Sequence, residues 1–384
     1  MAKETLPAVN GTVEPGFERV REVFARNFAR DDAYAEVGAA VAVYRKGRCV
    51  VDLWGGHADG ARTRPWSRDT LVNVWSCTKG VTAACLALLV DEQRLRYEDL
   101  VRTHWPDFAD AGKGGTTVEQ LLSHQAGLQG FAEPTSLGDL YDWQTCCERL
   151  ARQAPVWPPG MQTSYHAMTW GYLAGELLRR IMGESPGAFL ARRLAGPLRA
   201  DVFVGLPESE ESRVAEQLPP LSRPSMGDRR PPPEAMMALV NPQVPPTAPN
   251  DRAWRAAQIP AANGQASAQG LARVYAMIAN GGELDGARYL SKTTIARMSA
   301  VPALREDLLI GLRDNWAMGF SRNAMGMLGP EPDAFGHSGW GGSFGCAHLA
   351  SGLSIGYVCN RMGADLVGDP RGRALCDAIF ACVR

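Results

Sequence analysis

Residues 75–80, with the sequence WSCTKG, precede a long apolar run at 81–90. We expect a buried helix to begin here, and the three-residue spacing then places Ser76 and Lys79 on one face, one turn apart. In the first turn, Ser76 would lie at the positive end of the helix dipole, beside free backbone N–H groups. A serine hydroxyl becomes a nucleophile when a base takes its proton, and burial makes lysine such a base by favouring its neutral form. The pair predicts the Ser-x-x-Lys arrangement of serine acyl enzymes.

A chance match is the alternative explanation of this motif. The chain contains 18 serines and five lysines, and about a quarter of one such match is expected by chance in a chain of this composition. The long apolar run that follows Lys79 favours the chemical interpretation, and so do two later stretches.

The first of these stretches contains Tyr165. It lies between a proline-rich turn at 155–160 and a predicted helix at 168–182 that ends at Gly183. A phenol in the loop at a helix entrance can point into a cleft, although a tyrosine at such a place is commonly a packing residue with a solvated hydroxyl. The second stretch, 335–343 (FGHSGWGGS), is glycine-dense and precedes a hairpin predicted at 344–350 and 353–360.

A second serine motif occurs at 341–345, where GGSFG matches the G-x-S-x-G nucleophile elbow of α/β-hydrolases. That mechanism needs a strand, turn and helix around the serine, followed by an acid and then a histidine. The residues after Ser343 predict a hairpin instead, and the last histidine, His348, precedes every later aspartate. We therefore expect Ser343 not to be the nucleophile.

The order of the predicted elements indicates how these residues are positioned. A helix at 15–28 and a hairpin at 37–44 and 49–54 come first, a largely helical region follows, and the strands at 335–360 and a helix from Asp369 close the chain. This order predicts an α+β fold in which an antiparallel sheet, built from both ends of the chain and flanked by helices, carries an inserted helical domain. We expect the sheet domain over 1–75 and 265–384 and the helical domain over 76–264, with the site at their junction.

The stretch 218–250 interrupts the helical region with ten prolines in 33 residues. Proline density of this kind argues against a regular helix or a central strand. We expect a long excursion that either walls the cleft or is mobile. Trp157 and Trp254 are further candidates for shaping the pocket.

Charge and composition exclude several classes of function. A net charge of −1 provides no basic surface for nucleic acid or anionic membrane. No run approaches 18 apolar residues, and residues 1–7 lack the apolar core of a signal peptide. The nine cysteines form no C-x-x-C pair, so we expect reduced thiols in a cytoplasmic protein, with Cys77 a small packing residue. No feature indicates an oligomeric state.

Together, Ser76-x-x-Lys79, Tyr165 and His337-Ser338-Gly339 resemble the motifs of class C β-lactamase-like serine hydrolases, most closely the family VIII carboxylesterases. The resemblance extends from about residue 37 to the last helix, and it includes 121–128, 171–183 and 281–299. It implies a fold like that of β-lactamases and penicillin-binding proteins, and no metal or organic cofactor.

The resemblance also implies a role for each residue. Ser76 would be acylated, with Lys79 and Tyr165 as a hydrogen-bonded pair that shares the general base and acid work. The backbone N–H groups of Ser76 and Trp340 would form the oxyanion hole. His337, Ser338 and Gly339 would contact the substrate. Which member of the pair is the formal base is left open by the sequence.

Two departures from the β-lactamase pattern favour an esterase. His337 stands where β-lactamases carry the lysine of Lys-Thr-Gly, and residues 165–167 replace Tyr-x-Asn with Tyr-His-Ala. Both changes weaken the recognition of a β-lactam, whereas an ester needs no charged anchor. The sequence thus predicts hydrolysis of small or medium acyl esters. Acyl transfer to an alcohol or amine, weak β-lactam or D-amino-acid peptide hydrolysis, and a non-catalytic binding protein are the alternatives.

Overall fold

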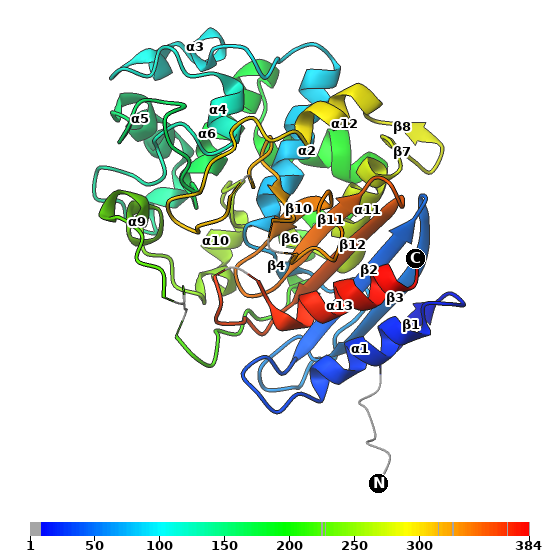
Figure 1. The fold of residues 1–384 in the computed structure, drawn as a ribbon. Helices are drawn as coiled ribbons and strands as arrows, with labels where there is room; N and C mark the ends of the chain where they lie inside the picture. Colours follow the sequence, from blue (N-terminus) through cyan, green and yellow to red (C-terminus); the bar gives the residue numbers. More distant parts are fainter. Residues whose placement is uncertain are drawn as a thin grey trace.

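The computed structural model describes residues 9–223, 226, 228–313, 315–324, 326–366 and 368–383. Residues 1–7, where no signal peptide is predicted, lie outside this part of the chain. A seven-stranded antiparallel sheet combines strands from both ends of the chain (Figure 1), which confirms the predicted fold class. In spatial order its strands are β1 (Asn10–Val13), β3 (Arg48–Gly56), β2 (Gly38–Arg45), β12 (Leu353–Cys359), β11 (Phe344–His348), β10 (Phe335–Ser338) and β9 (Ser321–Arg322).

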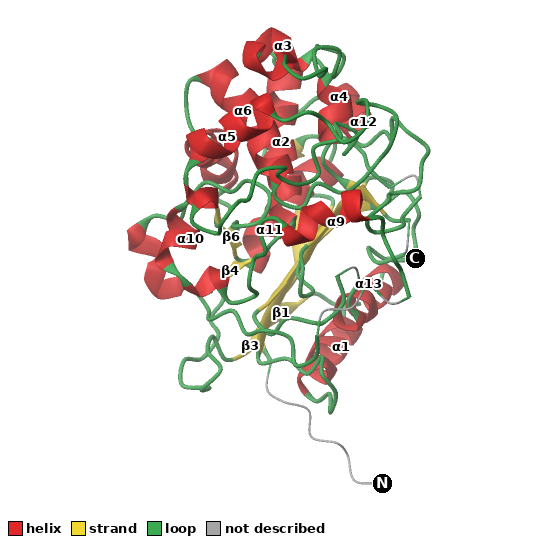
Figure 2. Ribbon diagram, turned by 90° about the vertical axis from the view of Figure 1, so that its left-hand side faces the viewer, coloured by secondary structure: helices red, strands yellow, loops and turns green. Residues whose placement is uncertain are grey.

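Both faces of this sheet are buried. Along β2, Ala40 and Ala42 contribute to one hydrophobic core, whereas Val41 and Val43 contribute to the other, as the two-residue period of a strand requires. Helix α11 (Ala268–Ala279) packs on the first face, and α1 (Glu18–Phe28) and α13 (Pro370–Ala381) lie side by side on the second (Figures 1 and 2).

The predicted boundaries of these elements hold to within a few residues. Helix α1 begins at Glu18 rather than at Pro15, because Gly16 has a left-handed φ of 93° and the residues before the helix form a turn. The hairpin of β2 and β3 turns at Lys46 and Gly47, both of which have positive φ, as a tight hairpin with right-handed twist favours. The side chains of Ser267 and Asp369 cap α11 and α13, and Asp369 is where the last helix is predicted to begin.

Helix α2 (Cys77–Asp91) crosses the middle of the molecule between the sheet and the other helices (Figure 1). Every residue from Cys77 to Val90 is buried, which is the pattern of a helix surrounded by protein on all sides. The helices around it and along the rest of the chain are α3 (Val101–His104), α4 (Val118–Leu122), α5 (Trp143–Arg152), α6 (Thr169–Met182), α7 (Pro186–Leu190), α8 (Gly196–Leu198), α9 (Pro233–Val240), α10 (Arg252–Ala256) and α12 (Lys292–Met298).

Two small sheets complete the fold. The first joins β4 (Val72–Asn73), β6 (Gln265–Ala266) and β5 (Val202–Phe203), and so ties the segment just before α2 to the segment just before α11. The second is the hairpin of β7 (Glu283–Leu284) and β8 (Ala287–Arg288). Short 3₁₀ turns occur at Pro106–Ala109, Asp139–Tyr141, Glu208–Arg213 and Ala248–Asn250, and a π turn occurs at Ala191–Ala195.

The expectation that residues 218–250 contain no regular helix is wrong for α9. Pro233 occupies the first turn of this helix, where its missing N–H has no helical partner to lose. The nine cysteines are all free. Within the described residues, none of the helices combines the length and the apolar composition needed to cross a membrane.

Candidate active site

Ser76 lies at the N-terminal end of α2, at the edge of a cavity of about 300 Å³. The residue before it, Trp75, has a left-handed φ of 47°, an unfavourable conformation for a bulky side chain. Trp75 packs its ring against Trp340 and Trp254, at centroid distances of 5.0 and 5.6 Å. The sharp turn between β4 and α2 thus exposes Ser76 to the cavity, and aromatic packing maintains the strained backbone.

Lys79 lies one turn along the helix and has no exposed surface. Its Nζ is 2.7 Å from the carbonyl oxygen of Ala167, 3.1 Å from that of Ala261 and 3.3 Å from Ser76 Oγ. Burial lowers the pKa of Lys79 well below its usual value, because an ammonium group loses its hydration in the interior.

Tyr165 reaches the same oxygen from a distant loop. Its hydroxyl donates a hydrogen bond of 2.6 Å to Ser76 Oγ, and burial raises the pKa of the phenol. The contact between Lys79 and Tyr165 differs from the direct hydrogen bond expected from the resemblance. Lys79 Nζ lies over the aromatic ring, 4.7 Å from its centroid, and the two side chains meet through Ser76 Oγ.

The oxyanion-hole candidates lie on two elements that pack together. The Ser76 amide is at the start of α2, and Trp340 follows β10, which contacts that helix. Within the described residues, neither amide N–H has a hydrogen-bond partner, so both are free to donate to an oxyanion. The Arg371 guanidinium fixes the turn after Trp340 through a hydrogen bond of 2.9 Å to the carbonyl of Gly341.

His337 and Ser338 line the cavity, whereas Gly339 is not among its lining residues. A Cβ atom at Gly339 would approach the carbonyl oxygen of Val74 to 2.2 Å, so glycine allows β10 to lie close to the start of α2. The His337 ring is buried, and its Nδ1 is 2.8 Å from the carbonyl of Ser338. Burial and, secondarily, Lys79 lower the pKa of His337 to about 3, so this imidazole is neutral near pH 7.

The cavity walls are mainly apolar. Ala238, Leu239 and the following loop at 242–244 form one side, which confirms that the proline-rich excursion walls the cleft. Leu309, Ile310 and Leu312 form another. No Asp, Glu, Lys or Arg is found among the described residues that line the cavity.

Comparison with known proteins places this geometry in a family. The sequence model of the Beta-lactamase family matches residues 24–377. The chain belongs to the beta-lactamase family. Esterase/beta-lactamase LipL of Mycobacterium tuberculosis (strain ATCC 25618 / H37Rv) is 36% identical over 382 residues, which cover 94% of this chain and 84% of that protein.

Two solved structures from this family extend over nearly the whole chain. The crystal structure of a family VIII carboxylesterase is 45% identical, with a TM-score of 0.91 and coverage of 98% of this chain and 100% of that one. A penicillin-binding protein homolog from Caulobacter crescentus is 41% identical, with a TM-score of 0.90 and the same coverage. The protein is thus a serine hydrolase of the beta-lactamase family, as the motifs predict.

In this beta-lactamase-family fold, the serine of the G-x-S-x-G motif is structural. Ser343 is buried, and its Oγ accepts a hydrogen bond of 3.2 Å from the amide of Cys359 in β12. The Cys77 thiol is also buried and donates to the carbonyl of Ser343 at 3.3 Å. Burial raises the pKa of Cys77, which agrees with a packing role for this thiol.

The sequence misses several residues around the site and misplaces two. Trp316, which follows the loop at 307–312, lines the cavity and stacks on Tyr165, and no local pattern marks it. Trp254 is fully buried in the core, and neither it nor Trp157 lines the cavity. The prediction that these two tryptophans line the pocket is therefore wrong, because Trp254 fills the core behind Trp75 and Trp157 lies partly exposed in its turn.

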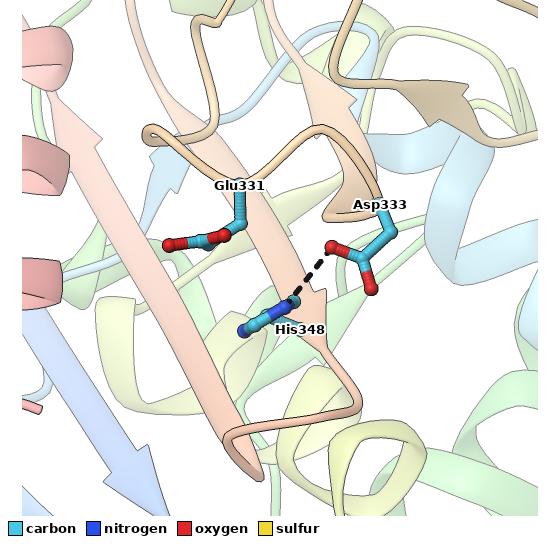
Figure 3. Close-up of side chains that lie close together, drawn as sticks. All are labelled: Glu331, Asp333 and His348. Carbon is cyan, nitrogen blue, oxygen red and sulfur yellow. Dashed lines mark ion pairs between the residues drawn. The ribbon is translucent and has the colours of Figure 1, made fainter. Parts of the chain in front are cut away.

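The described residues include one group that could provide ligands to a metal ion, formed by Glu331, Asp333 and His348 (Figure 3). His348 Nε2 pairs with Asp333 at 3.1 Å, and its Nδ1 is 2.8 Å from Ser351 Oγ. Asp333 is exposed, and these contacts satisfy both nitrogens of the imidazole. The group lies outside the set of residues that line the cavity.

Proposed function

We propose that the protein is a serine carboxylesterase that hydrolyses uncharged esters of small or medium acyl chains through an acyl-enzyme on Ser76. The observation that carries this proposal is the convergence of Lys79 Nζ and the Tyr165 hydroxyl on Ser76 Oγ, at 3.3 and 2.6 Å. Acyl transfer requires a nucleophile with a general base and a general acid within hydrogen-bonding distance.

The hydrogen bonds of Lys79 support its assignment as the general base. A neutral amine has two N–H donors and one lone pair. The carbonyls of Ala167 and Ala261 take the two donors, which leaves the lone pair for the proton of Ser76. The Tyr165 hydroxyl, whose pKa is raised by burial, keeps its proton at rest and donates to Ser76 Oγ.

The proposed cycle has two steps. Ser76 Oγ attacks the ester carbonyl while its proton moves to Lys79 Nζ, and the free amides of Ser76 and Trp340 stabilise the oxyanion. When the C–O bond of the ester breaks, Tyr165 protonates the departing alkoxide, which leaves a phenolate near the Lys79 ammonium group. Water then attacks the acyl-enzyme and gives one proton to this phenolate. Lys79 returns its proton to Ser76 Oγ as the C–O bond of the acyl-enzyme breaks, which releases the acid and restores all three side chains.

The apolar cavity supports the assignment to neutral esters. Since the described lining contains no cationic side chain and His337 is neutral, a substrate carboxylate would lose its hydration without gaining a partner. We therefore place β-lactams and D-amino-acid peptides second, although the name of the mycobacterial relative combines esterase with beta-lactamase. A cytoplasmic location stays a prediction, to which the nine free thiols lend support.

Fluorophosphonate labelling tests the proposal directly. We expect intact mass to show one adduct on the wild-type chain, peptide mapping to place it on Ser76, and S76A to lose both the adduct and ester turnover. Full turnover by folded S76A would refute the proposal. Product analysis with an added alcohol separates hydrolysis from acyl transfer, and nitrocefin tests β-lactam cleavage.

A further inference from the structure

Asp307 is a fully buried carboxylate beside the active-site cavity. Its Oδ1 accepts hydrogen bonds of 2.9 Å from the backbone N–H groups of Leu309 and Ile310, and its Oδ2 accepts one of 2.7 Å from the indole N–H of Trp316. In the described part of the chain, no cation forms an ion pair with Asp307. Burial of an unpaired carboxylate is unfavourable, and groups of this kind concentrate where function requires them.

Trp316 connects this carboxylate to the catalytic tyrosine. Its ring stacks on that of Tyr165 with a centroid distance of 5.0 Å and an interplanar angle of 14°. The ring of His337 also stacks on Trp316, with a centroid distance of 5.8 Å and an interplanar angle of 29°. The ring of His124 packs against Trp316 in an edge-to-face arrangement, with a centroid distance of 4.4 Å. A tryptophan packed between these rings and held at Nε1 has little freedom to rotate.

The backbone provides a second connection between Asp307 and Tyr165. The amide of Leu308 donates a hydrogen bond of 2.9 Å to the carbonyl of Thr163, two residues before the tyrosine. The amide of Asp307 itself donates to Leu312 at 2.9 Å, which closes the loop that forms one cavity wall. Asp307 thus joins the wall, the tryptophan and the segment that carries Tyr165.

We propose that Asp307 and Trp316 are positioning residues that hold the Tyr165 hydroxyl in line with Ser76 Oγ. Asp307 fixes the plane of the Trp316 indole, and the indole fixes the plane of the Tyr165 ring. This inference rests on the proposed function, because it assumes that Tyr165 transfers protons to and from Ser76. It gives Asp307 and Trp316, which lie outside the Ser-Lys-Tyr set, a role in the rate of acylation.

The first test measures acylation in D307N, W316F and W316L. Asn has the size of Asp but cannot accept hydrogen bonds on both sides, Phe keeps a ring to stack on, and Leu keeps neither ring nor N–H. Since a displacement of about 1 Å can cost about 100-fold in rate, we expect kcat to fall about 10- to 100-fold in D307N and W316L, with KM within about threefold. W316F should retain more activity than W316L.

A matched control comes from a second indole–carboxylate pair in the molecule. Trp143 Nε1 donates to the buried carboxylate of Glu176 at 2.8 Å, between α5 and α6 and away from the cavity. W143F breaks the same kind of hydrogen bond, and we expect it to leave kcat unchanged. If W143F lowers kcat as much as W316F does, the loss reflects general destabilisation and the proposal is overturned.

A double-mutant cycle decides whether Trp316 acts through Tyr165. The rate of Ser76 labelling is measured in the wild-type chain, W316L, Y165F and the double variant. We expect W316L to slow labelling strongly in the wild-type background and less than about twofold in the Y165F background, since coupled residues are not additive. An equal effect in both backgrounds overturns the proposal. If Ser76 of the wild-type chain is labelled and W316L is labelled at the same rate, the positioning role is refuted but the proposed function is not. If the wild-type chain is not labelled at all, both the proposed function and the positioning role are refuted.

Discussion

Lys79 and Lys113 are both fully buried, and the ends of both side chains contact backbone carbonyl oxygens. Lys113 Nζ donates to three of them, those of Asp110, Ala151 and Gln153, at 2.9, 2.9 and 2.5 Å. Lys79 Nζ contacts two carbonyls, and its third neighbour is the hydroxyl of Ser76. The two sites therefore differ in one acceptor.

We propose that this acceptor separates a structural lysine from a catalytic base. Three carbonyls match the three N–H groups of an ammonium ion, and although burial lowers the pKa of Lys113 to about 8, the nearby Asp110 carboxylate opposes the shift. Lys113 is thus mostly charged at pH 7. Lys79 has no carboxylate among the groups that affect its pKa, and burial lowers that pKa well below its usual value. The third neighbour of Lys79 is a hydroxyl group, which can give up a proton, whereas the third neighbour of Lys113 is a carbonyl oxygen, which cannot.

The largest effect should follow removal of the base. In K79M an apolar side chain of similar length replaces the amine, so Ser76 loses its proton acceptor. Because general base catalysis contributes about 100- to 10,000-fold, we expect ester turnover and Ser76 labelling to fall about 1,000-fold. Circular dichroism should confirm that K79M is folded. Residual turnover within tenfold of wild type would show that Lys79 is not the base.

The corresponding change at the structural site should affect stability instead. K113M leaves three buried carbonyls without their donor, and the loss of charge-assisted hydrogen bonds predicts a decrease of about 3 kcal/mol in the free energy of unfolding. Urea denaturation measures this decrease. Turnover per folded molecule should equal that of wild type at temperatures below the transition. A folded K113M as inactive as K79M would remove the distinction between the two sites.

The pH dependence of stability sharpens the comparison. A lysine whose folded pKa lies below its unfolded value of about 10.4 binds fewer protons when folded, so its contribution to stability rises with pH by up to about 1.4 kcal/mol per pH unit between the two values. This window begins near pH 8 for Lys113, and the contribution of Lys79, whose pKa burial also lowers, has the same sign. Wild type should therefore gain stability relative to K113M as the pH rises from 8 to 10, and only slightly between pH 6 and 7. Equal slopes in the two pH ranges would mean that Lys113 in the folded protein does not titrate near pH 8.

The sequence is sufficient for the fold and for the approach of Lys79 to Ser76, because both follow from local patterns. The Ser-x-x-Lys spacing lies within one helical turn at the start of α2, and short apolar runs bounded by turn residues mark the strands of the sheet. Even α9, which the density of prolines argues against, follows a local rule, since Pro233 is in the first turn of this helix.

The parts that the sequence does not predict depend on contacts between distant segments. Asp307 and Trp316 approach Tyr165 only after the loop at 307–312 packs against the segment at 163–165. The acceptors that leave the Lys79 lone pair for Ser76 are main-chain carbonyls, of Ala167 and Ala261. Because every residue has a main-chain carbonyl group, the residue types at positions 167 and 261 do not reveal that these carbonyls accept hydrogen bonds from Lys79.

The smallest effect should come from His337, which takes the place of a lysine in the β-lactamase pattern. With a pKa of about 3 its imidazole is neutral, so it offers neither a charge to bind a carboxylate nor a second base near Ser76. In H337A the cavity becomes larger, and we expect the ratio of kcat/KM for octanoyl and acetyl esters to change about tenfold, since a few methylenes in an apolar pocket have effects of this size. Labelling of Ser76 by a small phosphonate should stay within about threefold. A loss of labelling as deep as that of K79M would make His337 part of the proton transfer, and Lys79 would no longer be a sufficient base.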